Sequence, residues 1–151
     1  MFGALRIAAA AVACAGITIA GAGAASAEQA SAPAHFTNLA ALEHSFTAAP
    51  FHAHVVTPGH YRARVDGATL RASVTSTRVH CTIVDGTRAE HVAWFRACAD
   101  VRYAGARPHV SARWTHNHLA CACARRFGAA AFELIPATDG SSYELIVSTT
   151  D

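Results

Sequence analysis

The chain has 151 residues, a length typical of one domain, and its 12 basic residues are all arginine against 10 acidic residues. The hydrophobic fraction is 52%, but 37 residues are alanine, so the composition indicates one modest core and not a membrane protein. Length and composition exclude a multidomain protein, a coiled coil, a collagen and an acidic disordered tail. Abundant Ala, Arg and Gly with no Lys is typical of a GC-rich bacterial genome.

Residues 1–27 have the three-part layout of a secretory signal peptide. Met1–Arg6 carries one positive charge, Ile7–Ala25 is uncharged and apolar, and Ala25-Ser26-Ala27 offers the small residues that signal peptidase reads. We therefore expect cleavage before Glu28 and a secreted or periplasmic location, with no stable membrane span after cleavage. The alternative is an uncleaved anchor, because the apolar segment is long enough to cross a bilayer.

The chain expected after cleavage is nearly neutral. Residues 28–151 contain 11 arginines and 10 acidic residues, a net charge of +1 with histidine neutral. This nearly neutral charge does not indicate a basic surface for binding phosphates, so we expect no nucleic acid partner. All ten histidines lie in this part of the chain, and the surface charge should therefore rise strongly between pH 7 and pH 5.

The first folded segment is expected to be short. Residues 28–50 are predicted to form a leader that holds one helix over Leu39–Phe46, capped by Asn38, because its apolar residues recur on one side. Residues 51–151 are predicted to form a single globular domain.

Alternating residues predict a hairpin near the middle of the chain. Tyr61–Val65 and Ala68–Val74 flank Asp66-Gly67, a pair of residues that favours a tight two-residue turn. Arg78–Val84 alternates in the same way, and its inward set places Cys81 in the core.

A helix is predicted to follow this strand. Thr87 and Glu90 have the spacing of a capping box, which indicates a helix from Arg88 to about Ala99. The helical period predicts a buried stripe of Ala89, Val92, Phe95 and Ala99.

The last third of the chain favours strands. Pro108–Thr115 is predicted to be a strand, whereas His116–Gly128 suits either a helix or a strand. Phe132–Ile135 and Tyr143–Ser148 flank the turn residues Asp139–Ser142 and predict a second hairpin. Together the elements predict an α+β fold, in which an antiparallel sheet built from hairpins is packed by one or two helices.

Four cysteines lie outside the signal, at Cys81, Cys98, Cys121 and Cys123. An even number in a small exported domain predicts two disulfides, with three connectivities possible. A bond between Cys121 and Cys123 is the least favourable, because alternate strand residues lie about 6.6 Å apart with parallel side chains. We expect one of these two to pair with Cys81 and the other with Cys98.

The same segment concentrates potential metal ligands. His116, His118, Cys121 and Cys123 form a His-x-His and a Cys-x-Cys pair, and a mixed nitrogen and sulfur set suits zinc or copper. Disulfide formation is the stronger interpretation in an oxidising compartment, and the two pairs have opposite strand parity. We therefore expect no metal or other cofactor, with a copper or zinc site as the alternative.

No sequence pattern indicates a catalytic centre, since the serines lie outside a Gly-x-Ser-x-Gly context and no glycine loop could cradle a phosphate. Arg62, Arg64, Arg71 and Arg78 are candidates for a basic stripe on one sheet face that binds an anionic surface. Trp94 lies off the helix stripe, which suits either an interface anchor or a residue at the rim of the core.

The leading hypothesis is a non-enzymatic exported domain that binds a protein or surface partner and is stabilised by disulfides. The alternatives are a cell-envelope metal-binding protein that uses the His/Cys cluster, and a secreted hydrolase whose residues meet from distant parts of the chain. The sequence carries no signal for an oligomeric state.

Overall fold

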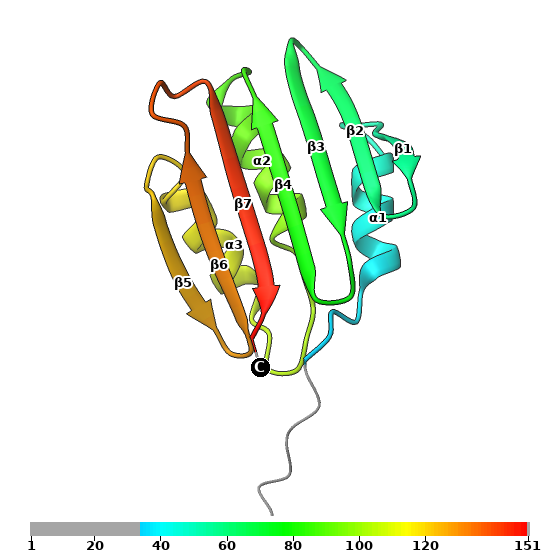
Figure 1. The fold of residues 1–151 in the computed structure, drawn as a ribbon, viewed down its shortest axis with the longest axis vertical. Coiled ribbons are helices and arrows are strands. Elements are labelled where there is room, and N and C mark those ends of the chain that lie inside the picture. The colour runs from blue at the N-terminus through cyan, green and yellow to red at the C-terminus, as the bar shows by residue number, and fades with distance from the viewer. Residues whose placement is uncertain (1–33, 151) are drawn as a thin grey trace, which may run out of the picture. The chain divides into compact units, whose positions relative to one another are not determined.

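The computed structural model describes residues 34–150 (Figure 1). The predicted signal peptide and the first residues of the expected leader lie outside this part. The described residues contain three helices, none long and apolar enough to cross a membrane, and seven strands. In chain order they are α1 (Leu39–Thr47), β1 (His54–Thr57), β2 (His60–Val65), β3 (Ala68–Val74), β4 (Arg78–Val84), α2 (Arg88–Cys98), α3 (Pro108–Asn117), β5 (Cys123–Phe127), β6 (Ala130–Pro136) and β7 (Ser142–Thr149).

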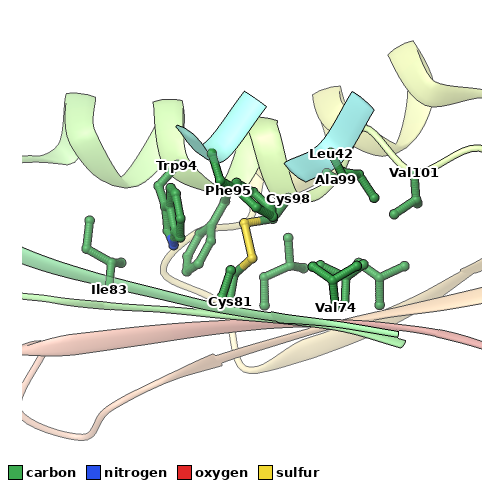
Figure 2. Close-up of a cluster of buried hydrophobic side chains, with 14 of the residues drawn as sticks. Leu42, Val74, Cys81, Ile83, Trp94, Phe95, Cys98, Ala99 and Val101 are labelled. Atoms are coloured by element: carbon green, nitrogen blue, oxygen red, sulfur yellow. A yellow bond between two sulfur atoms is a disulfide. The ribbon is translucent and has the colours of Figure 1, made fainter. Parts of the chain in front are cut away.

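All seven strands form one antiparallel sheet in the order β1-β2-β3-β4-β7-β6-β5. The three helices lie on one face of this sheet, and the core fills the space between the two layers (Figures 1 and 2). The predicted α+β fold, an antiparallel sheet packed by helices, is therefore confirmed. No helix among the described residues covers the opposite face (Figure 1).

The locally encoded elements form as predicted. β2 and β3 pair from Val65↔Ala68 outward, and the turn between them has positive φ at Asp66 (45°) and Gly67 (95°), as a type I′ hairpin requires. At the start of α2 the Thr87 side chain accepts from the Glu90 backbone, and the Glu90 side chain accepts from the Thr87 backbone, so the capping box is present.

The strand predicted over Pro108–Thr115 is wrong, because this segment is helix α3. Proline is tolerated in the first turn of a helix, where its missing N–H would have no partner. Ser111, Trp114 and Thr115 are the buried residues, a helical spacing, and the Thr115 hydroxyl donates to the Ser111 carbonyl at 2.9 Å. The buried positions thus follow the helical period, whereas the apolar residues Val110, Ala112 and Trp114 alternate as in a strand.

Helix α1 is part of the domain core. Leu42 and Phe46 are buried in the same cluster as the sheet residues, so the folded domain extends upstream of residue 51. Asn38 occupies the predicted N-cap position, but its side chain makes no hydrogen bond to the first turn of this helix. Its side chain instead donates to the carbonyl of Asp100 at 2.6 Å and accepts from the N–H of Arg102 at 2.7 Å, which ties α1 to the loop after α2.

The disulfide joins Cys81 of β4 to Cys98 of α2, and both residues are fully buried (Figure 2). The predicted pairing of these residues with Cys121 and Cys123 is wrong, since the latter two are free. The sheet order explains this result. Helix α2 packs over β4, whereas β5, which begins at Cys123, forms the far edge of the sheet, separated from β4 by β7 and β6.

Helix α2 is also rotated relative to the predicted stripe. Its buried residues are His91, Trp94, Phe95 and Cys98, whereas Ala89 is exposed. Trp94 has no exposed surface, and its indole N–H donates to the Thr82 carbonyl at 3.1 Å, so it is not an interface anchor. Phe95 and Ala99 of the predicted stripe are buried, whereas Val92 is only partly buried. Burying an indole and a disulfide removes more apolar surface from water than fully burying Ala89 and Val92, which accounts for the rotation.

Candidate functional site

The uncovered face of the sheet carries three of the four predicted interface arginines close together. Successive residues of a strand point to opposite faces. Because Tyr61 and Ala63 are buried, Arg62 and Arg64 lie on the outer face and are exposed. Arg62 lies directly opposite Arg71 of β3, which is also exposed.

Arg78 stands apart from these three arginines. It begins β4 and pairs with Ser148 of β7, whereas the β4 residue opposite Arg71 is Thr82. Four residues separate Arg78 from Thr82, which corresponds to about 13 Å along a strand. The predicted stripe is thus a cluster of Arg62, Arg64 and Arg71 with one remote arginine.

A hollow of about 470 Å³ opens beside Arg62 and Arg71 on β2 and β3. We call it the outer-face hollow, and its polar lining residues are His60, Arg62, Arg71, Ser73, His80 and Thr82. Val56 of the edge strand β1, 57% exposed, contributes to the apolar part of the lining. The register explains this grouping, because Ser73 pairs with both His60 and His80 while Arg71 pairs with Thr82.

The two arginines of the hollow have no anionic partner within the described residues. The ion pairs in residues 34–150 are His80 with Glu144 at 2.9 Å and Arg102 with Asp100 at 3.8 Å. Like charges directly opposite in a sheet destabilise it, so the Arg62–Arg71 pair carries an electrostatic cost. A bound anion would remove this repulsion and accept hydrogen bonds from both guanidinium groups.

The predicted metal ligands do not assemble. His116 is exposed on α3, whereas His118 stacks on Trp114 and donates from Nδ1 to its carbonyl at 2.7 Å. Residues 34–150 contain no group of three or more His, Cys, Asp or Glu side chains that could hold a metal ion. His116 and His118 lie at the end of helix α3, whereas Cys121 lies in the following loop and Cys123 begins β5, so the four residues do not share one element.

The Cys123 thiol is not an activated nucleophile. Burial, followed by contact with the Cys121 thiol, raises the pKa of Cys123 to about 11, so its thiol is protonated at neutral pH. Our expectation of no metal assumed that both cysteines were bridged, and that premise is wrong. What remains is two neighbouring thiols at the start of β5.

Four residues of the hollow were not predicted to lie beside the arginines, namely His60, Ser73, His80 and Thr82. Alternation along the strands could have placed these residues on the outer face, because each of them lies next to buried residues of its strand. Their convergence in one hollow depends on the registers of β2, β3 and β4, which parity alone does not define. Comparison of the chain with protein-family models, with curated proteins and with solved structures gave no match.

Proposed function

We propose that this protein is an exported, non-enzymatic domain that binds an anionic group of its partner on the open face of its sheet. The observation that carries this proposal is the cross-strand pair Arg62–Arg71 in the outer-face hollow, without a carboxylate partner among residues 34–150. Arginine presents its donors in a planar fork that suits carboxylate, sulfate and phosphate groups.

The size and lining of the hollow support recognition of a small anionic group. Its volume of about 470 Å³ lies within the range of small-ligand sites, roughly 300–1,000 Å³. The hydroxyls of Ser73 and Thr82 and the imidazoles of His60 and His80 add polar groups beside the two arginines. The group bound here is therefore a carboxylate, sulfate or phosphate carried by a larger partner.

Export is supported by the N-terminal pattern and by the cysteine chemistry. Residues 1–27 have the layout of a cleavable signal, and a buried disulfide suits a protein that folds in an oxidising compartment. A binding role without catalysis is supported by the protonated Cys123 thiol and by the bridged state of Cys81 and Cys98. Periplasm and external medium are both compatible with this chemistry.

Titration of isotope-labelled residues 28–151 with inorganic phosphate and with citrate, followed by NMR at low salt, tests this proposal. We expect saturable shifts confined to amides of β2, β3 and β4. The double variant Arg62→Gln/Arg71→Gln should weaken binding at least about tenfold, because each charged hydrogen bond contributes roughly 1.5 kcal/mol or more.

Arg78→Gln/Arg126→Gln is the matched control, since it also removes two positive charges from the same face, outside the hollow. It should change the affinity by less than about twofold, as expected for distant charges screened by water. Equal losses in the control and in Arg62→Gln/Arg71→Gln would mean that the anions respond only to net charge, and the proposal would be rejected. Absence of saturable binding at low salt would reject it as well.

A further inference from the structure

The helical side of the domain contains a second recognition surface. A groove of about 940 Å³ runs over the solvent side of α2, between the end of α1 and the start of α3. We call it the helix groove. Its apolar lining comes from Phe51, Ala89, Val92, Ala93, Ala97 and Ala112. The rotation of α2 that buries Trp94 and Cys98 creates this floor, because it leaves Ala89 exposed and Val92 only partly buried.

The groove continues along α3 into a neighbouring hollow of about 370 Å³ that reaches Leu119. The two cavities share five lining residues, namely Val92, Arg96, His109, Ala112 and His116. The apolar surface is therefore a track along α2 and not an isolated pit. Helix α2 has 11 residues and is about 16 Å long, so the track can accommodate about three turns of a second helix.

The rim of the helix groove is basic. Arg88 and Arg96 of α2 and His109 and His116 of α3 line it, and all four are exposed. Within the described residues neither arginine has an ion-pair partner. Asp100 is the one acidic lining residue, and its carboxylate is engaged 3.8 Å from Arg102.

An apolar floor of small residues with a cationic rim is complementary to an amphipathic helix that has an acidic polar face. Small side chains allow two helix backbones to approach closely, and helix-in-groove recognition uses apolar residues spaced by three or four positions. Acidic residues beside that stripe would meet the unpaired arginines, which gives specificity and faster association.

We propose that the helix groove docks an acidic amphipathic helix of a partner protein. This chain does not offer such a helix among its described elements, because α1 and α2 each contain one acidic residue and α3 contains none. Residues 1–33 contain one acidic residue, Glu28. The groove lies on the side of the sheet opposite the outer-face hollow, so this inference does not depend on the proposed anion site.

A designed peptide provides the probe. It has 14 residues, with leucine at positions 3, 6, 10 and 13, glutamate at the flanking positions and a fluorescent label. We expect fluorescence anisotropy to show saturable binding to residues 28–151. A peptide with lysine in place of each glutamate, and a peptide with serine in place of each leucine, should each bind at least about tenfold more weakly, since both charge and apolar contacts contribute.

Protein variants locate the contact. Arg88→Glu/Arg96→Glu should weaken binding of the acidic peptide at least about tenfold, because like charges across an interface are repulsive. Ala97→Glu should weaken it by placing a carboxylate on the apolar floor. Arg78→Glu/Arg126→Glu on the opposite face is the control, because it makes the same charge change outside the helix groove and outside the outer-face hollow, and it should leave the affinity within about twofold. Circular dichroism of each variant confirms that it is folded.

Three outcomes would overturn the proposal. These are no binding of the acidic peptide, equal binding of the lysine peptide, and equal losses in the Arg88→Glu/Arg96→Glu variant and the Arg78→Glu/Arg126→Glu control. Sedimentation of the unliganded domain adds a fourth. A dimer that dissociates in Arg88→Glu/Arg96→Glu would identify the occupant as a second copy of this chain and reject a foreign helix.

Discussion

Loss of the disulfide should have a large and calculable effect on stability. Cys81 and Cys98 are 17 residues apart and join the central strand to the helix that covers it (Figure 2). A cross-link across a loop of this length restricts the unfolded chain and stabilises the native state by about 3 kcal/mol in the chain-entropy model. For a domain of this size each kcal/mol shifts the unfolding midpoint by roughly 4 °C, so the expected decrease is about 12 °C.

The variant Cys81→Ala/Cys98→Ala removes the bond without placing a hydroxyl in the core. Its midpoint, followed by circular dichroism without reductant, should fall by about 12 °C or more, because removal of two buried sulfurs adds a packing loss to the entropic one. Wild-type protein refolded in reductant should lose a similar amount, whereas reductant should not change the midpoint of the double variant.

The matched control is Cys121→Ala/Cys123→Ala. Both residues are free and half-buried, so this change should lower the midpoint by only a few degrees and leave the sensitivity to reductant intact. If instead the control loses its sensitivity to reductant, or Cys81→Ala/Cys98→Ala keeps its wild-type midpoint, then the covalent link lies elsewhere and the reasoning is refuted. Mass spectrometry of peptides from non-reduced protein identifies the bonded pair directly.

Three further predictions concern the start of α2 and the predicted cleavage of the signal peptide. Thr87→Ala should lower the free energy of unfolding by about 1 kcal/mol, measured by urea denaturation, because it removes an N-cap acceptor. A hydrogen bond from the Thr87 N–H, followed by one from the Thr87 side chain, lowers the pKa of Glu90 below 4.5. The stabilisation from the ionised Glu90 is therefore complete above about pH 4.5 and is lost as the pH falls through the lowered pKa. Glu90→Gln should make stability less dependent on pH in acid, and an unchanged pH dependence would contradict this assignment. Mass spectrometry of protein recovered outside the cytoplasm should give an N-terminus at Glu28, and retention of Met1 would contradict cleavage.

The two proposed surfaces follow from the one-sided packing of the fold. Because all three helices cover the same side of the sheet, the polar residues of β2, β3 and β4 remain available on the other side (Figure 1). On the helical side, α2 buries its aromatic residues and presents alanines outward. One small domain thus has a polar hollow and an apolar groove on opposite layers, and the two proposals together would let it hold two partners at once.

Features encoded by neighbouring residues could be predicted from the sequence. The Asp66-Gly67 hairpin, the strand Arg78–Val84 and the Thr87–Glu90 capping box each depend on contacts within a few residues, where local backbone preferences decide the outcome. The α+β fold class and the burial of Cys81 followed from the same local patterns. Strand parity also placed all four candidate arginines on one face, although the register sets Arg78 apart from the other three.

Arrangements that depend on distant residues were decided by the tertiary structure. β7 pairs with both β4 and β6, which places β5 at the sheet edge and leaves Cys121 and Cys123 outside the reach of Cys81. The helix over Pro108–Asn117 and the rotation of α2 likewise follow from which side chains the completed core can bury. The sequence by itself determined the turns, caps and strand faces, because these use contacts between near neighbours. Strand order, disulfide pairing and both proposed surfaces required the packed sheet, because their free energy comes from contacts between segments far apart in the chain.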